Sequence, residues 1–259
     1  MNSKGRKAIG HSIWFKVILT MLIFLPSYTQ ITYNSTMTAD VIASVLSHPM
    51  IYSIRWILPV AKLFLLLAII LPAISNRFSQ RYLLGYYSFI LLVTGILQNM
   101  AFTKDYGFSW LVGNTLVELT ILTFCIFDVF KNKTVIKWGN MNTKRLWVLI
   151  PMALAFLMPF SVDSLNRVSP SFTSNVLFNE SGLTYCMVTP AILGMLLLFS
   201  KGAHKPTFSV ISYVGLIFGI FNMTTWFGMQ RESWWMGVLH LPLLVLSFYG
   251  LLVSRKAIA

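Results

Sequence analysis

Residues 234–253 read WWMGVLHLPLLVLSFYGLLV, and this stretch decides the class of the protein. It contains no Asp, Glu, Lys or Arg. An α-helix rises about 1.5 Å per residue, so a run of this length reaches about 30 Å, the thickness of the hydrocarbon core of a bilayer. Tryptophan begins the stretch and Arg255 follows it, as in helices anchored at both membrane surfaces. The stretch therefore predicts a transmembrane helix.

The rest of the chain repeats this pattern. Further apolar runs, bounded by polar, Gly or Pro residues, lie near 12–27, 52–74, 82–102, 108–130, 146–162, 183–200 and 207–229. Of the 259 residues, 56% are hydrophobic and only 10% are charged, whereas soluble domains carry about 25% charged residues. This composition excludes a soluble enzyme, a disordered regulator and a nucleic-acid-binding module. We expect an all-α integral membrane protein with about eight transmembrane helices.

The positive charges fall in every second connection between the expected spans. Lys and Arg number 20, against 7 Asp and Glu. The basic connections contain Lys4, Arg6, Lys7, Arg77, Arg81, Lys131, Lys133, Lys137, Lys144, Arg145, Lys201, Lys205, Arg255 and Lys256. The alternate connections contain Asp40, Asp105, Asp163, Glu180 and Glu232. By the positive-inside rule, both termini are expected in the cytoplasm, with the protein in the cell membrane. No nucleic-acid partner is expected.

Matching intervals predict an internal duplication. Trp14 precedes Pro26 by twelve positions, and Trp147 precedes Pro159 by the same interval. Two more matches follow in the same order, Pro59 with Pro190 and Gly95-Ile96 with Gly219-Ile220. Two tandem four-helix units, which would be parallel, account for this order. The expected organisation is a basic tail 1–11, a first unit 12–130, a basic linker 131–145, a second unit 146–253 and a tail 254–259.

Each four-helix unit resembles the DoxX-type membrane bundle in its helix count and in the long loop after its first helix. The resemblance covers the topology of both halves and no residue motif. A carboxylate is expected early in the second helix of such a bundle, and this chain has Lys62 in that region. The resemblance therefore implies a four-helix arrangement and no activity.

Two charged residues fall near the middle of expected spans. Lys62 is one position from the middle of the run 52–74, and Glu118 is one position from the middle of the run 108–130. Charges in the hydrocarbon are costly and mark candidate functional sites. Because pairing lets both groups stay ionised, we expect Lys62 and Glu118 to form an intramembrane charge pair. The pair would either respond to protons or bind a charged substrate, or it would be purely structural. In the remaining alternative, Lys62 snorkels toward the membrane surface while a protonated Glu118 hydrogen-bonds locally.

Other polar side chains within the expected spans form a candidate polar pocket between the two halves. They are Gln98, Asn99, Asn114, Asn222 and His240. Amides at helix interfaces commonly hydrogen-bond neighbouring helices, and the same groups can line a pocket. His240 offers either an interhelical hydrogen bond or a pH-sensitive group.

The sequence lacks the motifs of common membrane enzymes. Only His240 of the four histidines lies in an expected span, so bis-His haem and di-iron sites lack ligands, and there is no HExxH motif. Cys125 and Cys186 form no CxxC pair. No metal and no cofactor is expected. For a lipid-modifying enzyme, only Asp128, Lys131 and the pair Arg231-Glu232 approach an interfacial cluster of acid and base.

The sequence favours a permease or binding-type membrane protein for a small solute or lipid, with its polar site between the halves. The first alternative is a non-catalytic scaffold, or a subunit of a larger complex with a membrane protein partner. A lipid-modifying enzyme is the weaker alternative. The bilayer itself is an expected partner in all three cases.

Overall fold

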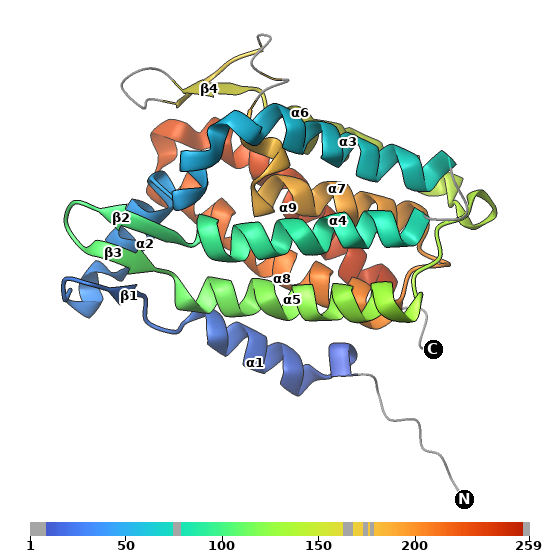
Figure 1. Cartoon of the computed structure of the whole chain (residues 1–259), viewed down its shortest axis with the longest axis horizontal. Helices are drawn as coiled ribbons and strands as arrows, with labels where there is room; N and C mark the ends of the chain where they lie inside the picture. Colours follow the sequence, from blue (N-terminus) through green and yellow to red (C-terminus); the bar gives the residue numbers. More distant parts are fainter. Residues whose placement is uncertain (1–8, 75–78, 163–167, 173–175, 177–178, 256–259) are drawn as a thin grey trace, which may run out of the picture.

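The structure is a computed structural model that describes residues 9–74, 79–162, 168–172, 176 and 179–255. It is an all-α bundle with short strands at one end (Figure 1). The helices are α1 (Ile13–Ile23), α2 (Thr38–Ser47), α3 (Leu58–Ile74), α4 (Ser79–Val93), α5 (Val112–Lys131), α6 (Leu149–Leu157), α7 (Tyr185–Leu198), α8 (Lys205–Met223) and α9 (Trp234–Arg255). Apart from α2, each of them lies within or overlaps one of the apolar runs of the sequence.

Short 3-10 and π-helical segments extend or join these helices. Thr94–Gln98 (η4) continues α4 as a π-helical turn, and Thr224–Met229 (η9) continues α8 in the same way. The 3-10 segments include η1 (Ile9–His11), η3 (Met50–Ile57), η6 (Thr143–Val148) and η8 (Glu180–Gly182). π-turns are rare and interrupt the regular hydrogen-bond ladder, so their neighbours must bind the freed carbonyls.

A three-stranded sheet lies at the end of the bundle where α4 ends and α5 begins, which we name the sheet end (Figure 1). β2 (Met100–Thr103) and β3 (Gly107–Trp110) form an antiparallel hairpin, and β1 (Tyr28–Thr29) pairs with β3. Gly107 has a φ of +64°, which glycine adopts without steric cost, and it closes the hairpin. β4 (Phe160–Val162) and β5 (Val168–Pro170) form a second antiparallel pair. Strands of two to four residues give no readable sequence pattern, and the sequence predicted none.

The opposite end carries η1, the end of α9 and most of the basic connections, and we name it the basic end (Figure 1). α5 finishes there at Asn132, whose φ of 48° ends the helix in a left-handed turn. The linker then packs beneath the turn between α7 and α8, where the Val135 amide donates to the Gly202 carbonyl. The predicted basic linker is therefore a folded connection.

Buried apolar side chains form the core where the two halves meet. α7 is buried along its whole length and packs against α3, α4, α6, α8 and α9. Large apolar side chains on the outer helices face outward instead, among them Trp14, Ile18, Met21, Phe127, Phe130 and Ile150. An apolar exterior around an apolar core is typical of a protein that lies in lipid.

Helix length supports fewer membrane spans than the sequence predicts. Three helical segments are long and apolar enough to cross a bilayer, Val112–Lys131, Lys205–Met229 and Arg231–Arg255. A fourth is added if Ser35–Ile54 and Leu58–Pro72, which meet at 90°, count as one span. α6 has nine residues, and at 1.5 Å per residue it rises about 14 Å, roughly half of the hydrocarbon thickness. The described helices thus support a membrane protein with three or four candidate spans, while the eight-span expectation is met only in part.

A close approach of α1 to α5 gives the first testable prediction. A Cβ atom at Gly113 would lie 2.3 Å from the Leu22 carbonyl oxygen, whereas one at Gly85 meets no atom within 4 Å. We expect Gly113→Ala to lower the free energy of unfolding by about 1–3 kcal/mol, because α1 must move away from α5. Gly85→Ala is the matched control and should leave stability unchanged or raise it by up to about 1 kcal/mol.

Thermal unfolding of the detergent-solubilised protein measures both effects. Equal unfolding temperatures for the two variants would contradict the close packing of α1 on α5.

Candidate functional site

The carboxyl group of Glu118 lies buried between α4 and α5 and is bound at both oxygens. Only 3% of Glu118 is exposed. The Thr94 hydroxyl donates to Oε2 (2.7 Å), and the Asn99 amide donates to Oε1 (2.9 Å). Among the described residues, no Lys, Arg or His lies within ion-pairing distance of this carboxyl. Its stabilisation therefore comes from neutral donors.

The π-turn η4 explains why these donors are available. The carbonyls of Thr94 and Gly95 lie where the regular helix is interrupted, and the Asn99 amide lies 3.4 Å from both oxygens. Thr115 of α5 donates its hydroxyl to the Gly95 carbonyl (2.7 Å) and accepts from the Trp110 indole (2.8 Å). The interruption of α4 and the burial of Glu118 thus belong to one hydrogen-bonded unit.

This unit reaches the second half of the chain through α7. The Gln98 side-chain oxygen accepts from the Tyr185 backbone amide (3.1 Å) and so binds an otherwise free donor at the start of α7. One turn further along, the hydroxyls of Tyr87 and Thr189 are 2.9 Å apart, and both side chains are fully buried. The polar groups between α4 and α7 hold the halves together near the sheet end.

Tyr185 has the least satisfied polar group at this junction. Its hydroxyl is buried beside Tyr87 and Thr189, yet it makes no hydrogen bond within 3.5 Å to any described residue. Cys186 follows it, and its sulfur accepts from the Asn222 amide of α8 (3.4 Å). We name this junction the Glu118 cluster, which comprises Tyr87, Thr94, Gln98, Asn99, Thr115, Glu118, Tyr185, Cys186, Thr189 and Asn222.

The expected charge pair between Lys62 and Glu118 is not formed. Lys62 is buried, and its ammonium group donates to Asn179 Oδ1 (2.8 Å) and to the Val176 carbonyl. It also lies 4.9 Å from the centre of the Phe156 ring. Lys62 thus binds the segment between α6 and α7, and Glu118 binds α4.

Two features of the fold account for the separation of Lys62 from Glu118. α4 lies between α3 and α5, as Figure 1 shows, and it packs on both. The chain also bends by 90° before Leu58, so Lys62 lies in the second turn of α3 and not at its middle. The sequence run 52–74 hid this bend, because the residues before it are also largely apolar.

Asn179 completes the contact made by Lys62. Its amide donates to the Leu157 and Met158 carbonyls, both at 2.7 Å, at the point where α6 ends. The hydroxyl of Ser181 donates to the Phe156 carbonyl (2.7 Å), and Gly182 packs against the backbone of Lys62. Lys62 therefore joins the first half to the second, a role that sequence reasoning missed.

The remaining predicted pocket residues divide between the cluster and its surroundings. Gln98, Asn99 and Asn222 lie in the Glu118 cluster. Asn114 is half-buried and makes no side-chain hydrogen bond to the described residues. His240 is separate, with its Nδ1 2.7 Å from the Met236 carbonyl and its ring beside Trp226. The expected pocket is thus assembled only in part.

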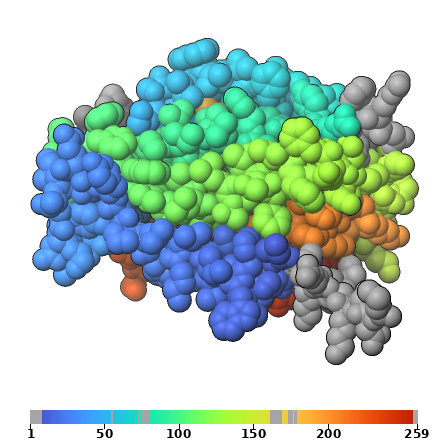
Figure 2. Space-filling view, turned by 60° about the horizontal axis from the view of Figure 1, so that its bottom comes forward, coloured from blue at the N-terminus to red at the C-terminus, as the bar shows by residue number. Residues whose placement is uncertain are grey.

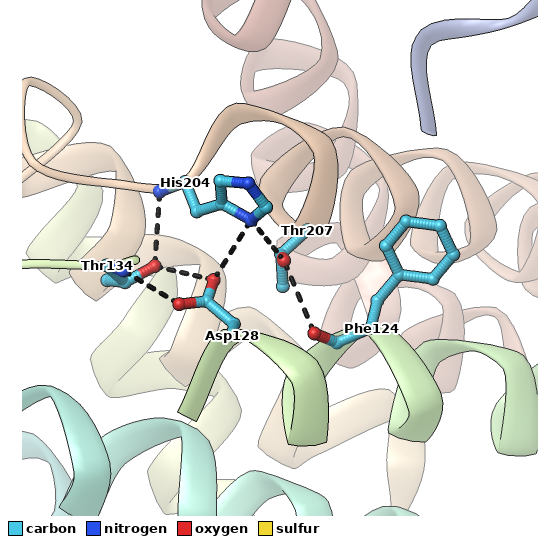
Figure 3. A network of polar contacts seen from close by, with 5 residues as sticks. All are labelled: Phe124, Asp128, Thr134, His204 and Thr207. Carbon is cyan, nitrogen blue, oxygen red and sulfur yellow. Dashed lines mark hydrogen bonds and ion pairs between the residues drawn. The ribbon is translucent and has the colours of Figure 1, made fainter. Parts of the chain in front are cut away.

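A second polar network lies at the basic end and was not predicted (Figure 3). Asp128, only 1% exposed, accepts from the backbone amide of Thr134 (2.7 Å) and from its hydroxyl (2.8 Å). His204 lies with its Nδ1 3.5 Å from Asp128 Oδ2 and 2.9 Å from the Thr207 hydroxyl. The network joins the end of α5, the linker and the start of α8, as Figure 3 shows.

The described residues contain no group of three or more His, Cys, Asp or Glu side chains that would hold a metal ion. No family model matches the chain, and neither a curated protein nor a solved structure matches it significantly. The chemistry of the site must therefore be argued from the Glu118 cluster itself. A buried carboxyl ringed by hydroxyls and amides can take up a proton or bind a small cationic group.

The contact between Lys62 and Asn179 leads to a stability prediction. Lys62→Met keeps the aliphatic stem and leaves Asn179 Oδ1 and the Val176 carbonyl without their cationic donor. Losing a buried charge-assisted hydrogen bond should lower the free energy of unfolding by about 1–3 kcal/mol. Lys104→Met removes an exposed charge at the same end and serves as the control.

Thermal unfolding in detergent distinguishes the two variants. A Lys62→Met protein as stable as the Lys104→Met protein would show that Lys62 does not hold the halves together.

Proposed function

We propose that the protein is a multi-pass membrane permease or binding-type protein for a small solute, and that the Glu118 cluster is its site. The observation that carries the proposal is the buried carboxyl of Glu118, which has neutral donors and no cationic partner among the described residues. Ionisable groups within membrane spans commonly mark ion or proton pathways. The solute would carry a positive charge or move together with a proton.

The position of the cluster supports this proposal. Glu118 binds Thr94 and Asn99, and the neighbouring Gln98 binds the start of α7, so the cluster extends across the junction of the halves. Permeases built from repeats commonly place their sites at such a junction. The Tyr185 hydroxyl, which has no hydrogen bond within 3.5 Å to the described residues, adds a donor that a bound solute would satisfy.

The packing of the helices supports a tandem duplication as part of the proposal. In the first half, α1 packs on α5, α4 on α5, and α3 on α4. In the second half, α6 packs on α9, α8 on α9, and α7 on α8. These three contacts recur between corresponding helices of the two halves, whereas the packing of α7 on α6 and on α9 has no comparable counterpart among the described helices of the first half. We include eight crossings in the proposal, with the short helices extended by their flanking turns.

The distribution of charge gives the proposed orientation. η1 and the end of α9 lie at the basic end of the bundle (Figure 1), and the positive-inside rule assigns that end to the cytoplasm. The sheet end would then face outward from the cell membrane.

Glu118→Gln tests the role of the carboxyl group. The amide keeps the shape of the side chain and can still accept a hydrogen bond from Thr94 or Asn99, so the fold should persist. In proteoliposomes loaded with the pH-sensitive dye pyranine, we expect an imposed potential to drive protons through the wild-type protein. We expect at least a tenfold slower rate for Glu118→Gln and no change for Glu232→Gln, which alters an exposed carboxyl.

Water access to the cluster can be followed at Cys186. Cys125 is fully buried, so a membrane-impermeant methanethiosulfonate reagent should label Cys186 selectively if the cluster opens to water. Cys186→Ala provides the blank. Absence of labelling from both sides, together with equal proton flux in Glu118→Gln and wild type, would overturn the proposal and favour the scaffold alternative.

A further inference from the structure

The start of α1 carries a buried lysine that has no acidic partner. Lys16 is only 3% exposed, and its ammonium group lies 5.4 Å from the centre of the Tyr213 ring of α8. Within the described part of the chain it makes no ion pair and no side-chain hydrogen bond. A buried cation supported by one aromatic ring is incompletely compensated.

Other basic groups converge on the same corner of the basic end. η1 packs on the start of α8 so closely that a Cβ atom at Gly10 would lie 2.8 Å from the Pro206 carbonyl oxygen. Figure 2 shows the start of α1, in dark blue, beside the orange segment that leads into α8. We name this corner the basic corner, and it comprises His11, Lys16, His204, Lys205 and Arg255.

The positive groups in the basic corner act on one another. Burial lowers the pKa of the His11 imidazole, and four neighbouring positive groups lower it further. These neighbours are Lys16, His204, Lys205 and Arg255. The Nε2 atom of His11 is buried and has no hydrogen-bond partner among the described residues. The corner is therefore short of negative charge and has an unused nitrogen.

The acidic group nearest to this corner is already engaged. Asp128 accepts two hydrogen bonds from Thr134 and lies 3.5 Å from His204. Lys205 donates to the Ser200 carbonyl (2.7 Å), which is neutral. Arg255 is exposed at the end of α9. No described carboxylate lies within 4 Å of Lys16, Lys205 or Arg255.

We propose that the basic corner binds the phosphate group of an anionic phospholipid in the membrane leaflet at the basic end. The phosphate would neutralise the positive charges of Lys16 and Arg255 and accept a hydrogen bond from His11. An anion bound at the start of α8, a helix of nineteen residues, is also stabilised by the positive end of the helix dipole.

The outer face of α1 favours a lipid over a free anion. Trp14, Ile18 and Met21 are 75%, 57% and 65% exposed and point away from the bundle. Tryptophan prefers the head-group level of a bilayer, so Trp14 places the neighbouring Lys16 at the depth of lipid phosphates. Acyl chains would then lie along Ile18 and Met21, one and two turns further into the membrane.

Native mass spectrometry of protein released from nanodiscs tests this inference. The probes are phosphatidylglycerol and phosphatidylcholine with identical acyl chains, which differ in head-group charge. We expect wild-type protein to retain phosphatidylglycerol preferentially, and Lys16→Met to weaken that retention by about fivefold. Lys131→Met removes an exposed charge from the same end and should behave as wild type, and Lys16→Arg should restore retention.

Each remaining outcome counts for or against the inference. Equal retention of the two lipids by wild type, or unchanged retention by Lys16→Met, would overturn it. If excess inorganic phosphate displaces phosphatidylglycerol, the corner is a site for free anions and the lipid assignment is wrong. If Lys16→Met proves unstable, Arg255→Gln replaces it. A negative result would not affect the proposed solute site, because the Glu118 cluster lies near the sheet end and the basic corner lies at the basic end.

Discussion

The hydrogen bonds to the Glu118 carboxyl constrain the part of the structure that joins the two halves. A carboxyl that is 3% exposed needs donors, and these come from Thr94 and Asn99 at the two ends of one π-turn. The turn carries Gln98 to a position where its side chain binds the start of α7. It also ends α4 where the β2–β3 hairpin begins. Removing the carboxyl would therefore disturb the end of α4, its hairpin and the contact with α7 together.

Lys62 shows why the charge of a residue does not identify its partner. Both Lys62 and Glu118 are charged and nearly fully buried, and the sequence places them at matching positions in their runs. In the structure, each charged group binds neutral partners nearby. Lys62 donates to Asn179 and to a carbonyl, and Glu118 accepts from a hydroxyl and an amide. The attraction within a buried ion pair must offset the free-energy cost of removing two charges from water. Several neutral hydrogen-bond partners can therefore stabilise a buried charge as well as a counter-ion does. Glu118 is thereby left without the cation that would make it purely structural.

Apolar runs predicted the positions of the helices well, because a run of apolar residues in lipid has few alternatives to a helix. α5, α7 and α9 begin and end within four residues of the expected limits. The same signal placed Lys62 wrongly, since the apolar residues of η3 precede a 90° bend and do not extend α3. Contacts such as Tyr87 with Thr189 depend on which helices become neighbours, and periodicity does not encode that. Gln98, Asn99 and Asn222 were found because amides are rare in apolar runs, whereas threonines and tyrosines in such runs give no comparable signal.

For the permease proposed above, contacts between the halves at the two ends of the bundle define what a transport movement would have to break. Near the sheet end, Lys62 binds Asn179, Gln98 binds the Tyr185 amide, and Tyr87 binds Thr189. At the basic end, Asp128 of the first half lies 3.5 Å from His204 of the second. A rocking motion that opens the Glu118 cluster toward the sheet end must separate the first set and can keep the second. Opening toward the basic end must separate Asp128 from His204 and can keep the contacts near the sheet end. In the permease proposed above, these two sets of contacts would open in alternation, with the carboxyl of Glu118 at the junction of the halves.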